Sequence, residues 1–376
     1  MMTSSQLVAK DSTRLAFLDG LRGLAALYVV FYHVYHPLTH YGPLSFPANI
    51  LIGWAAAGRY AVALFIVLSG FVLMLPVTRS NTRMLKGGIR GFLLRRCRRT
   101  LPPYYFALVL SIIVVAFFEK QLNTPASYSE SLLPVLAPGS LLSHVFLVHT
   151  LNREWIFTIN SALWSVATEW HIYLVFAFVF IPLSKYIPIW MLTPLGFALG
   201  IALHLGLGIN SGAALWLLGL FAMGMLACEI ALGKPTRANR LPWRGIGLAA
   251  FALFAVLFGA QQTTFFKLPF GQTYQMVALD CLIGIATSCF IIAACQDRRL
   301  AASLERPIFQ RLGAFSYSLY LTHFPVLVIA DAFLRKSGVS PLAHLAGLVF
   351  LAVPAAIALA LVTYWLTERP LLRHRK

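Results

Sequence analysis

Charged residues are scarce in this sequence: Asp, Glu, Lys and Arg make up 11% of its 376 residues, where a soluble domain carries about 25%. Acidic residues are scarcest, since only 12 stand against 30 Lys and Arg. The hydrophobic fraction is 59% and the mean hydropathy is +0.77. In water such a chain would expose large apolar patches, and its 28 Phe, 14 Tyr and 8 Trp exclude a disordered chain. We therefore exclude a soluble globular enzyme and expect a membrane protein.

Cysteine is also rare. The five cysteines show no zinc-ligand spacing, and most of them lie in apolar runs. We therefore expect neither a structural disulfide nor a metal site.

Apolar runs account for most of the chain. A helix needs about 20 residues to cross roughly 30 Å of hydrocarbon, and lipid offers no partners for open strand edges. Ten runs are candidates: 15–36, 50–76, 101–118, 161–183, 187–207, 211–232, 245–261, 272–296, 312–334 and 341–366. The sequence predicts an all-α polytopic membrane protein with about ten transmembrane helices and both termini cytoplasmic.

The cations lie mostly on one side of this predicted topology. Of the 30 Lys and Arg, 23 fall in inside segments, five in outside segments, and Arg22 and Arg59 within spans. This bias is typical of a cytoplasmic-membrane protein and leaves no basic domain to bind nucleic acid. We expect a cytoplasmic segment 1–14, a transmembrane domain 15–366 with an outer loop at about 119–160, and a cytoplasmic tail 367–376.

The first span carries charged and titratable groups where the membrane makes them costly. Arg22 and His33 are eleven residues apart, so on a helix their side chains share a face and differ in height by roughly 16 Å. Asp19 lies three residues before Arg22 and could pair with it. We interpret this face as a candidate functional site. A structural ion pair and an interfacial histidine are the alternatives.

Six segments follow one another in a recognisable order. They are FLDGLRGLAALYVVFYHV with Arg22 and His33, GRYAVALFIVLSGFVL with Ser69, RRCRRTLPPYY with Arg96 and Arg99, LWSVATEWHIY with Glu169, LGAFSYSLYLTHFPV with Tyr317 and His323, and TERP at 367–370. Together they resemble the integral-membrane acyltransferase family 3, whose first helix carries an Arg and a His with ten residues between them. Ile66 and Thr322 depart from the pattern, where Phe and Trp are common.

The resemblance implies an enzyme that moves an acyl group, most often acetyl, from cytoplasmic acyl-CoA to a hydroxyl of an extracytoplasmic or lipid-linked carbohydrate. The donor substrate would be acyl-CoA, expected to be acetyl-CoA, with no metal. A carbohydrate or glycolipid acceptor and membrane lipids would be the partners, and nucleic acid would not. Arg96 and Arg99 could bind the CoA phosphates, with anionic-lipid contact as the alternative.

His33 is the candidate general base, since an imidazole titrates near neutral pH. Arg22 and Glu169 complete the candidate catalytic set. Glu169 could orient His33 or pair with Arg22, or serve only in a structural ion pair. Candidate substrate-binding residues are Ser69, Tyr317, His323 and Asp19, although His323 could equally be a packing residue near a helix end.

Several other titratable groups have no motif. Asp280 lies mid-span, and Glu229 is close enough to the cytoplasmic end to be solvated. Histidines 36, 40, 144 and 149 are expected to stay hydrated near the outer face.

Two other function classes remain open from sequence. A glycan or small-metabolite transporter or flippase would also have about ten spans with ionisable groups inside them, but internal repeats are not evident. A membrane scaffold or sensor is less attractive, because packing alone could use apolar residues in place of buried charges.

Overall fold

The computed structural model describes residues 16–39, 51–80, 82–122, 137–208, 213–262 and 271–373, and every regular element within them is a helix. The predicted cytoplasmic segment 1–14 and part of the predicted outer loop, 123–136, lie outside the described residues.

Nine helices in the described part of the chain are long and apolar enough to cross a membrane. They are Ala16–His36, Tyr60–Thr78, Gly88–Phe117, Leu163–Leu183, Ile189–Gly206, Trp243–Gln261, Gln272–Gln296, Ser316–Lys336 and Pro341–Leu371. The predicted span at 211–232 is a shorter apolar helix, α10 (Leu217–Leu232), of 16 residues. The all-α polytopic prediction is confirmed, with one of the ten spans shorter than expected.

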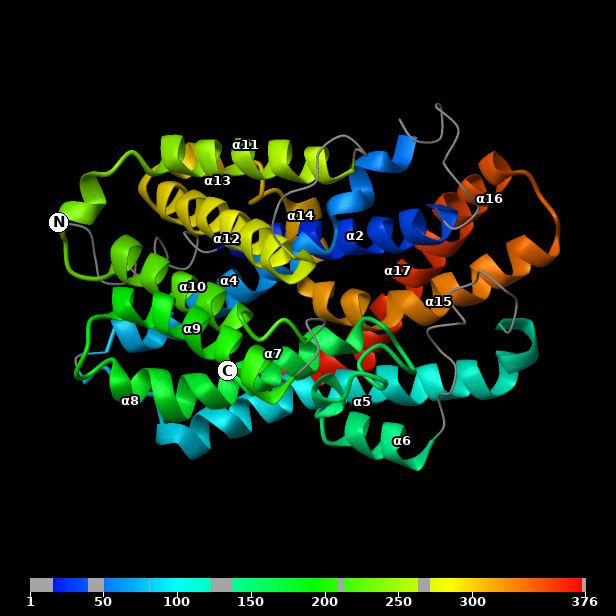
Figure 1. Cartoon of the computed structure of the whole chain (residues 1–376), viewed down its shortest axis with the longest axis horizontal. Coiled ribbons are helices and arrows are strands. Elements are labelled where there is room, and N and C mark those ends of the chain that lie inside the picture. The colour runs from blue at the N-terminus through cyan, green and yellow to red at the C-terminus, as the bar shows by residue number, and fades with distance from the viewer. Residues whose placement is uncertain are drawn as a thin grey trace. The chain divides into compact units, whose positions relative to one another are not determined.

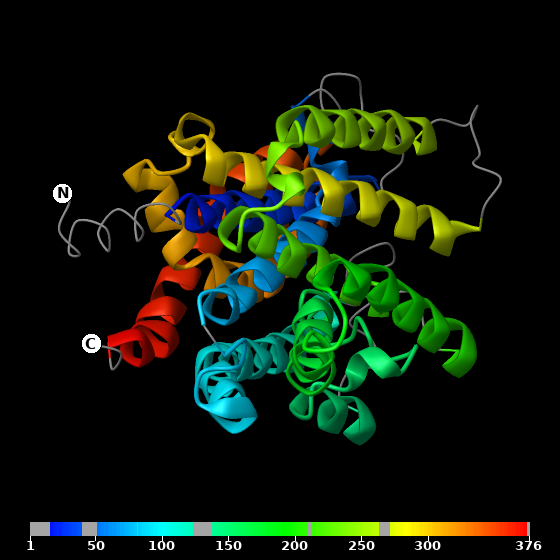
Figure 2. The same cartoon turned by 90° about the vertical axis from the view of Figure 1, so that its left-hand side faces the viewer.

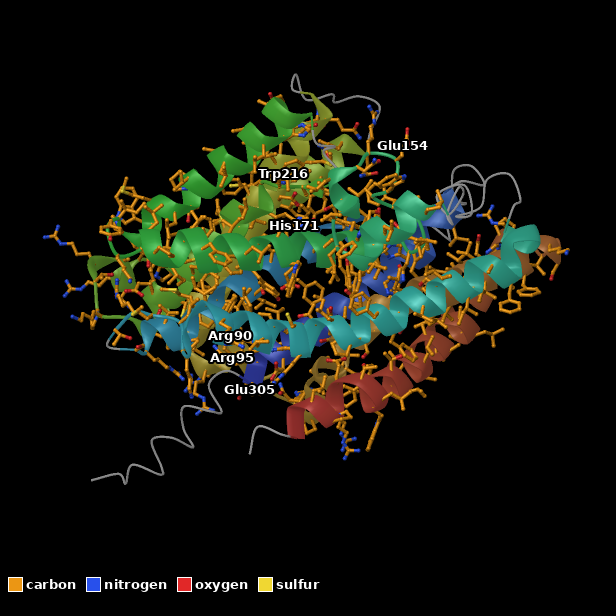
Figure 3. All side chains as sticks on the ribbon, turned by 90° about the horizontal axis from the view of Figure 1, so that it is seen from below. Arg90, Arg95, Glu154, His171, Trp216 and Glu305 are labelled. Atoms are coloured by element: carbon orange, nitrogen blue, oxygen red, sulfur yellow. The ribbon has the colours of Figure 1, made fainter. Side chains whose placement is uncertain are left out.

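The basic stretch before the third predicted span, 101–118, is helical from Gly88 onward, which corrects the start of that span. Helix α5 (Gly88–Leu122) is 35 residues long and carries Arg90 and Arg95, labelled in Figure 3, on its first turns. Arginine favours helices about as well as leucine does, but it lowers hydropathy, so a hydropathy pattern places the helix start too late. Similarly, the predicted span 50–76 begins with a short 3₁₀ turn (Gly53–Ala57) before α4 (Tyr60–Thr78).

The chain divides into two units, which we describe separately. The first unit comprises Met1–Ala25, Tyr60–Phe92 and His171–Gly313, and the second comprises Ala26–Arg59, Leu93–Trp170 and Ala314–Lys376.

Helices of the first unit pack through close backbone approaches. Helix α10 packs against α4 and α9 (Ile189–Leu207), while α11 (Trp243–Gln261) lies along α12 (Gln272–Gln296) in Figures 1 and 2. A Cβ on Gly70 of α4 would lie 2.0 Å from the Phe221 carbonyl oxygen, and one on Gly224 of α10 would lie 2.0 Å from that of Val67. Small residues allow the two backbones to approach this closely. In lipid, which is as apolar as the side chains themselves, such close packing drives the association of helices.

In the second unit, α15 (Ser316–Lys336) packs against α17 (Val353–Thr363), both labelled in Figure 1. The turn between α15 and α16 (Pro341–Gly347) is held by one buried carboxylate. Asp331 accepts hydrogen bonds from Arg335 Nε at 2.8 Å and from His344 Nε2 at 3.0 Å, and all three side chains are largely excluded from solvent. Buried charge is thereby paired at the point where the chain reverses direction.

Candidate active site

Helix α2 (Ala16–Thr39) carries both Arg22 and His33, so the two predicted residues do lie on one helix. Arg22 belongs to the first unit, where its Nη1 lies 3.5 Å from Asp19 Oδ1. Asp19 is 56% exposed, so solvent screens this pair and it contributes little to stability. The start of α2 is fixed instead by packing, since a Cβ on Gly20 would lie 2.2 Å from the Leu304 carbonyl oxygen.

His33 belongs to the second unit and meets a second histidine there. Its Nδ1 lies 3.0 Å from the Val29 carbonyl oxygen and 3.1 Å from Nε2 of His323 on α15. The two ring centroids are 4.9 Å apart, and Phe324 packs edge-on against His33. His323 is fully buried in the middle of α15, which corrects the expectation that it lies near a helix end.

A buried hydroxyl pair lies beside the histidines. The Tyr320 ring contacts His323, and its hydroxyl is 2.6 Å from Ser165 Oγ of α7 (Leu163–Val175). Glu169, one turn further along α7, interacts electrostatically with the same tyrosine hydroxyl. A carboxylate near a tyrosine–serine pair can bias which hydroxyl donates to the other.

Asn160 fixes the backbone next to this pair. Its side-chain amide donates to the Leu321 carbonyl oxygen on α15 and to Ser111 Oγ on α5, each at 3.0 Å. Its Oδ1 accepts from the Ala162 backbone N–H, which positions the start of α7. No sequence pattern drew attention to Asn160 or Ser111. Ser165 and Tyr320 stood within quoted motifs but had no role assigned.

The predicted CoA-binding arginines lie on the third and fourth turns of α5. Arg96 is half-buried and Arg99 is exposed. Tyr317 donates a 3.1 Å hydrogen bond from its hydroxyl to the Thr100 carbonyl oxygen, which ties the start of α15 to the same turn of α5. Tyr317 therefore has a structural contact in addition to its predicted substrate-binding role.

The glutamate of the TERP segment also belongs to this region. Glu368 accepts hydrogen bonds from the backbone N–H and hydroxyl of Ser318, in the first turn of α15, and interacts electrostatically with Arg99. A carboxylate at a helix N-terminus satisfies an otherwise unpaired N–H group and complements the helix dipole. The TERP motif had suggested no partner for Glu368, and its partner Ser318 lies 50 residues earlier in the sequence.

The remaining predicted residue, Ser69, belongs to the first unit and is buried on α4 beside the Gly70 crossing. Two carboxylates of the same unit now have partners. Asp280 accepts a 2.9 Å hydrogen bond from Trp216 Nε1, and Trp216 is labelled in Figure 3. Glu229 accepts from Arg83 and from the Thr78 hydroxyl, so it is paired and not simply solvated.

The segment between α5 and α7 buries two histidines that had been expected to stay hydrated. His144 of α6 (Pro138–Val145) and His149 are fully buried and stacked, with ring centroids 3.9 Å apart and planes 5° apart. Among the residues that the structure describes, no group of three or more His, Cys, Asp or Glu side chains is gathered to hold a metal ion.

Three comparisons extend these observations. The chain is 26% identical to YrhL of Bacillus subtilis, a proposed peptidoglycan O-acetyltransferase, over an alignment of 386 positions. This alignment covers 94% of this chain and 54% of that protein. The chain is 25% identical over 356 residues to the peptidoglycan O-acetyltransferase OatA of Listeria monocytogenes (85% and 50%), and 22% identical over 362 residues to the O-acetyltransferase OatA of Staphylococcus aureus (91% and 55%).

The chain thus spans about half the length of the curated relatives it matches. No solved structure matches it. The family model described as an acyltransferase domain matches residues 15–365, nearly the whole chain, and confirms the resemblance drawn from the six segments. The chain therefore belongs to this acyltransferase family.

Proposed function

We propose that this protein is a membrane O-acyltransferase that moves an acyl group, expected to be acetyl, from acyl-CoA to a hydroxyl of a carbohydrate. The observation that carries the proposal is the imidazole of His33, held on an apolar membrane-length helix by contacts to Val29 and His323. Family membership and the names of the relatives support an acetyl group and a peptidoglycan-like acceptor. We place the enzyme in the bacterial cytoplasmic membrane, with both termini inside.

In the proposed reaction His33 is the general base. As the acceptor oxygen attacks the thioester carbonyl, its O–H bond breaks and the proton passes to His33; the C–S bond then breaks and CoA leaves as a thiolate that takes up the proton. Arg22, Ser69 and Tyr317 remain candidates for stabilising the negative charge that develops on the thioester oxygen. Asp19 remains a candidate for binding substrate.

Arg96 and Arg99 are proposed to bind the phosphates of CoA. They are three residues apart on α5, so their side chains project from neighbouring positions on one helix face, and guanidinium groups match phosphate oxygens in geometry.

The test uses purified protein in lipid nanodiscs, acetyl-CoA labelled in the acetyl group, and soluble peptidoglycan fragments as acceptor. We expect labelled fragments, and a loss of rate on the order of 10²–10⁴-fold for His33→Ala. His36→Ala, one turn further along α2, is the matched control and is expected to keep its activity. Full activity of His33→Ala would contradict the assignment of the base. Uptake of fragments into proteoliposomes without acetyl-CoA would instead favour a carrier.

A second measurement tests the donor site. The double variant Arg96→Ala/Arg99→Ala is expected to raise the KM for acetyl-CoA on the order of tenfold or more, since each charge-assisted hydrogen bond contributes about 1.5–3 kcal/mol. Arg98→Ala removes an exposed charge from the same stretch and serves as the control. An unchanged KM in the double variant would return these arginines to lipid contact.

A further inference from the structure

The second histidine constrains where protons can sit in the histidine pair. His323 Nδ1 lies 3.0 Å from the Leu319 carbonyl oxygen, and a carbonyl can only accept a hydrogen bond. A neutral His323 therefore carries its proton on Nδ1. Its Nε2 then has a lone pair and acts as an acceptor.

The same reasoning applies to His33. Its Nδ1 faces two acceptors, the Val29 carbonyl oxygen at 3.0 Å and His323 Nε2 at 3.1 Å. A proton on His33 Nδ1 can be shared between these two acceptors. A lone pair on Nδ1 would instead face the lone pairs of both acceptors, which is repulsive. Neutral His33 is thus held as the Nδ1–H tautomer, and Nε2 is the nitrogen that can accept a proton.

The surroundings of the pair are consistent with a fixed arrangement. The titratable groups near His33 are His36 and Tyr32 on α2 and His323 on α15, while His323 contacts Tyr320 of its own helix. Glu169 of α7 interacts electrostatically with Tyr320, the tyrosine whose ring contacts His323. His323 is fully buried, so its ring is held by packing as well as by the Leu319 hydrogen bond.

From this geometry we propose that His323 is a positioning residue for the reaction: together with the Val29 carbonyl it holds His33 in the Nδ1–H tautomer, and it stabilises the imidazolium that forms when His33 Nε2 takes the acceptor's proton. This inference rests on the proposed function. The proton stays on His33 until the CoA thiolate takes it, and His323 remains neutral throughout. A hydrogen-bond acceptor behind a catalytic imidazole is usually a carboxylate, and here a neutral imidazole fills that place.

The proposal separates His323 from the substrate-binding role expected of it. A substrate-binding side chain affects KM for the acceptor, whereas a residue that acts only through the base affects kcat. Glutamine at position 323 offers a side-chain oxygen that can accept from His33 Nδ1, while alanine offers none. Comparing the two substitutions therefore shows whether the reaction needs a hydrogen-bond acceptor at position 323 or the imidazole ring itself.

The experiment compares wild type with His323→Ala, His323→Gln and Thr322→Val in nanodiscs. Thr322→Val is the matched control, since Thr322 is the buried neighbour on α15 and its hydroxyl donates within that helix, to the Ser318 carbonyl oxygen. For His323→Ala we expect kcat to fall on the order of 10²-fold, with both KM values changed less than about twofold. His323→Gln should recover most of the loss, and Thr322→Val should behave as wild type.

The tautomer is measured independently of activity. In protein labelled with ¹⁵N-histidine, the signals of His33, assigned by comparison with His33→Gln, should report Nδ1–H in wild type and in His323→Gln. In His323→Ala the excess of Nδ1–H over Nε2–H should be smaller, because of the two acceptors only the Val29 carbonyl remains. A wild-type protein that transfers no acetyl group would overturn the proposed function while these spectra still test the tautomer.

Three results would overturn the inference itself. One is a wild-type kcat in a folded His323→Ala protein, and another is a raised acceptor KM with kcat unchanged, which would restore a substrate-binding role. The third is an Nε2–H tautomer of His33 in wild type. If His323→Ala does not fold, the inference depends on His323→Gln, whose kcat must then stay within about tenfold of wild type.

Discussion

The two units of the chain bury different kinds of side chain. In the described part of the first unit the buried polar side chains are Ser69, Ser184, Asp280 and Thr287. The second unit buries histidines, an asparagine, two carboxylates and many hydroxyls, among them His144, Asn160, His323, Asp331 and Glu368. The first unit instead brings backbones together at glycines such as Gly70 and Gly224.

The difference teaches how each unit holds its helices together in lipid. Because lipid is as apolar as a leucine side chain, helices associate through close packing of small residues or through hydrogen bonds between polar ones. The first unit relies on the former and the second largely on the latter. Among the described residues, buried histidines occur in the second unit, which also contains the histidine pair His33 and His323.

The largest expected effect tests the polar interior of the second unit. Asp331→Ala removes the carboxylate that Arg335 and His344 share, and breaking a buried ion pair in this way typically costs about 3–5 kcal/mol. Thermal unfolding in detergent should show a large fall in Tm. The control is Asp280→Asn in the first unit, whose amide oxygen can still accept from Trp216. Equal Tm values for the two variants would remove the distinction between the units.

The next prediction tests the close packing of the first unit. A Cβ on Gly70 meets the Phe221 carbonyl oxygen at 2.0 Å, so Gly70→Ala forces the backbones of α4 and α10 apart, and we expect a loss of about 1–3 kcal/mol in stability. Gly259→Ala on α11 is the control, since a Cβ there meets nothing within 4 Å. A stability for Gly70→Ala matching that of the control would mean that α4 and α10 do not approach this closely.

The sequence predicts the fold better than it predicts the site. Length and hydropathy place the membrane helices, because each must satisfy its backbone internally and cover itself with apolar side chains. They misplace the start of α5, where arginines continue the helix beyond the apolar stretch. They also overestimate the length of α10. Its first residue is Leu217, after a turn at Leu215 and Trp216 that the apolar sequence does not reveal.

Within the site, what can be predicted is local. The spacing of Arg22 and His33 follows from helix geometry alone, and the Asp19 contact follows from a three-residue interval. The contact between His33 and His323 joins residues 290 apart, and no periodicity predicts it. The burial of His144 and His149 was missed for the same reason, since exposure depends on what packs over a loop and not on the residue type.

A smaller effect tests the N-terminus of α15. Glu368→Ala removes the acceptor of the Ser318 backbone N–H and hydroxyl, and the loss of a helix cap costs about 0.5–2 kcal/mol. Glu368→Gln keeps a side-chain oxygen in the same position and should recover most of the stability. Hydrogen exchange of the first turn of α15 measures both variants. Unchanged protection in Glu368→Ala would show that Ser318 is held by other contacts.

The smallest expected effect is a pH dependence confined to the segment 137–160 of the second unit. Burial lowers the pKa of His144 from its ordinary value of 6.5, so the folded segment favours the neutral imidazole. A group whose pKa is depressed by folding stabilises the folded state above its unfolded pKa and loses that contribution as the pH falls through the folded one. Protection of these amides from hydrogen exchange, corrected for the intrinsic rate, should therefore decrease below about pH 6.5.

The first unit provides the internal reference, because its described interior buries no histidine and α4 and α10 carry none, so the protection of α4 and α10 should stay constant over the same interval. His144→Phe keeps an aromatic ring to stack on His149 but cannot be protonated, and it should abolish the pH dependence of the segment. If the segment in His144→Phe still loosens at low pH, the protonated group is another one, and His149 is then the side chain to replace. If both units loosen together, the polar interior of the second unit does not respond to pH independently of the first.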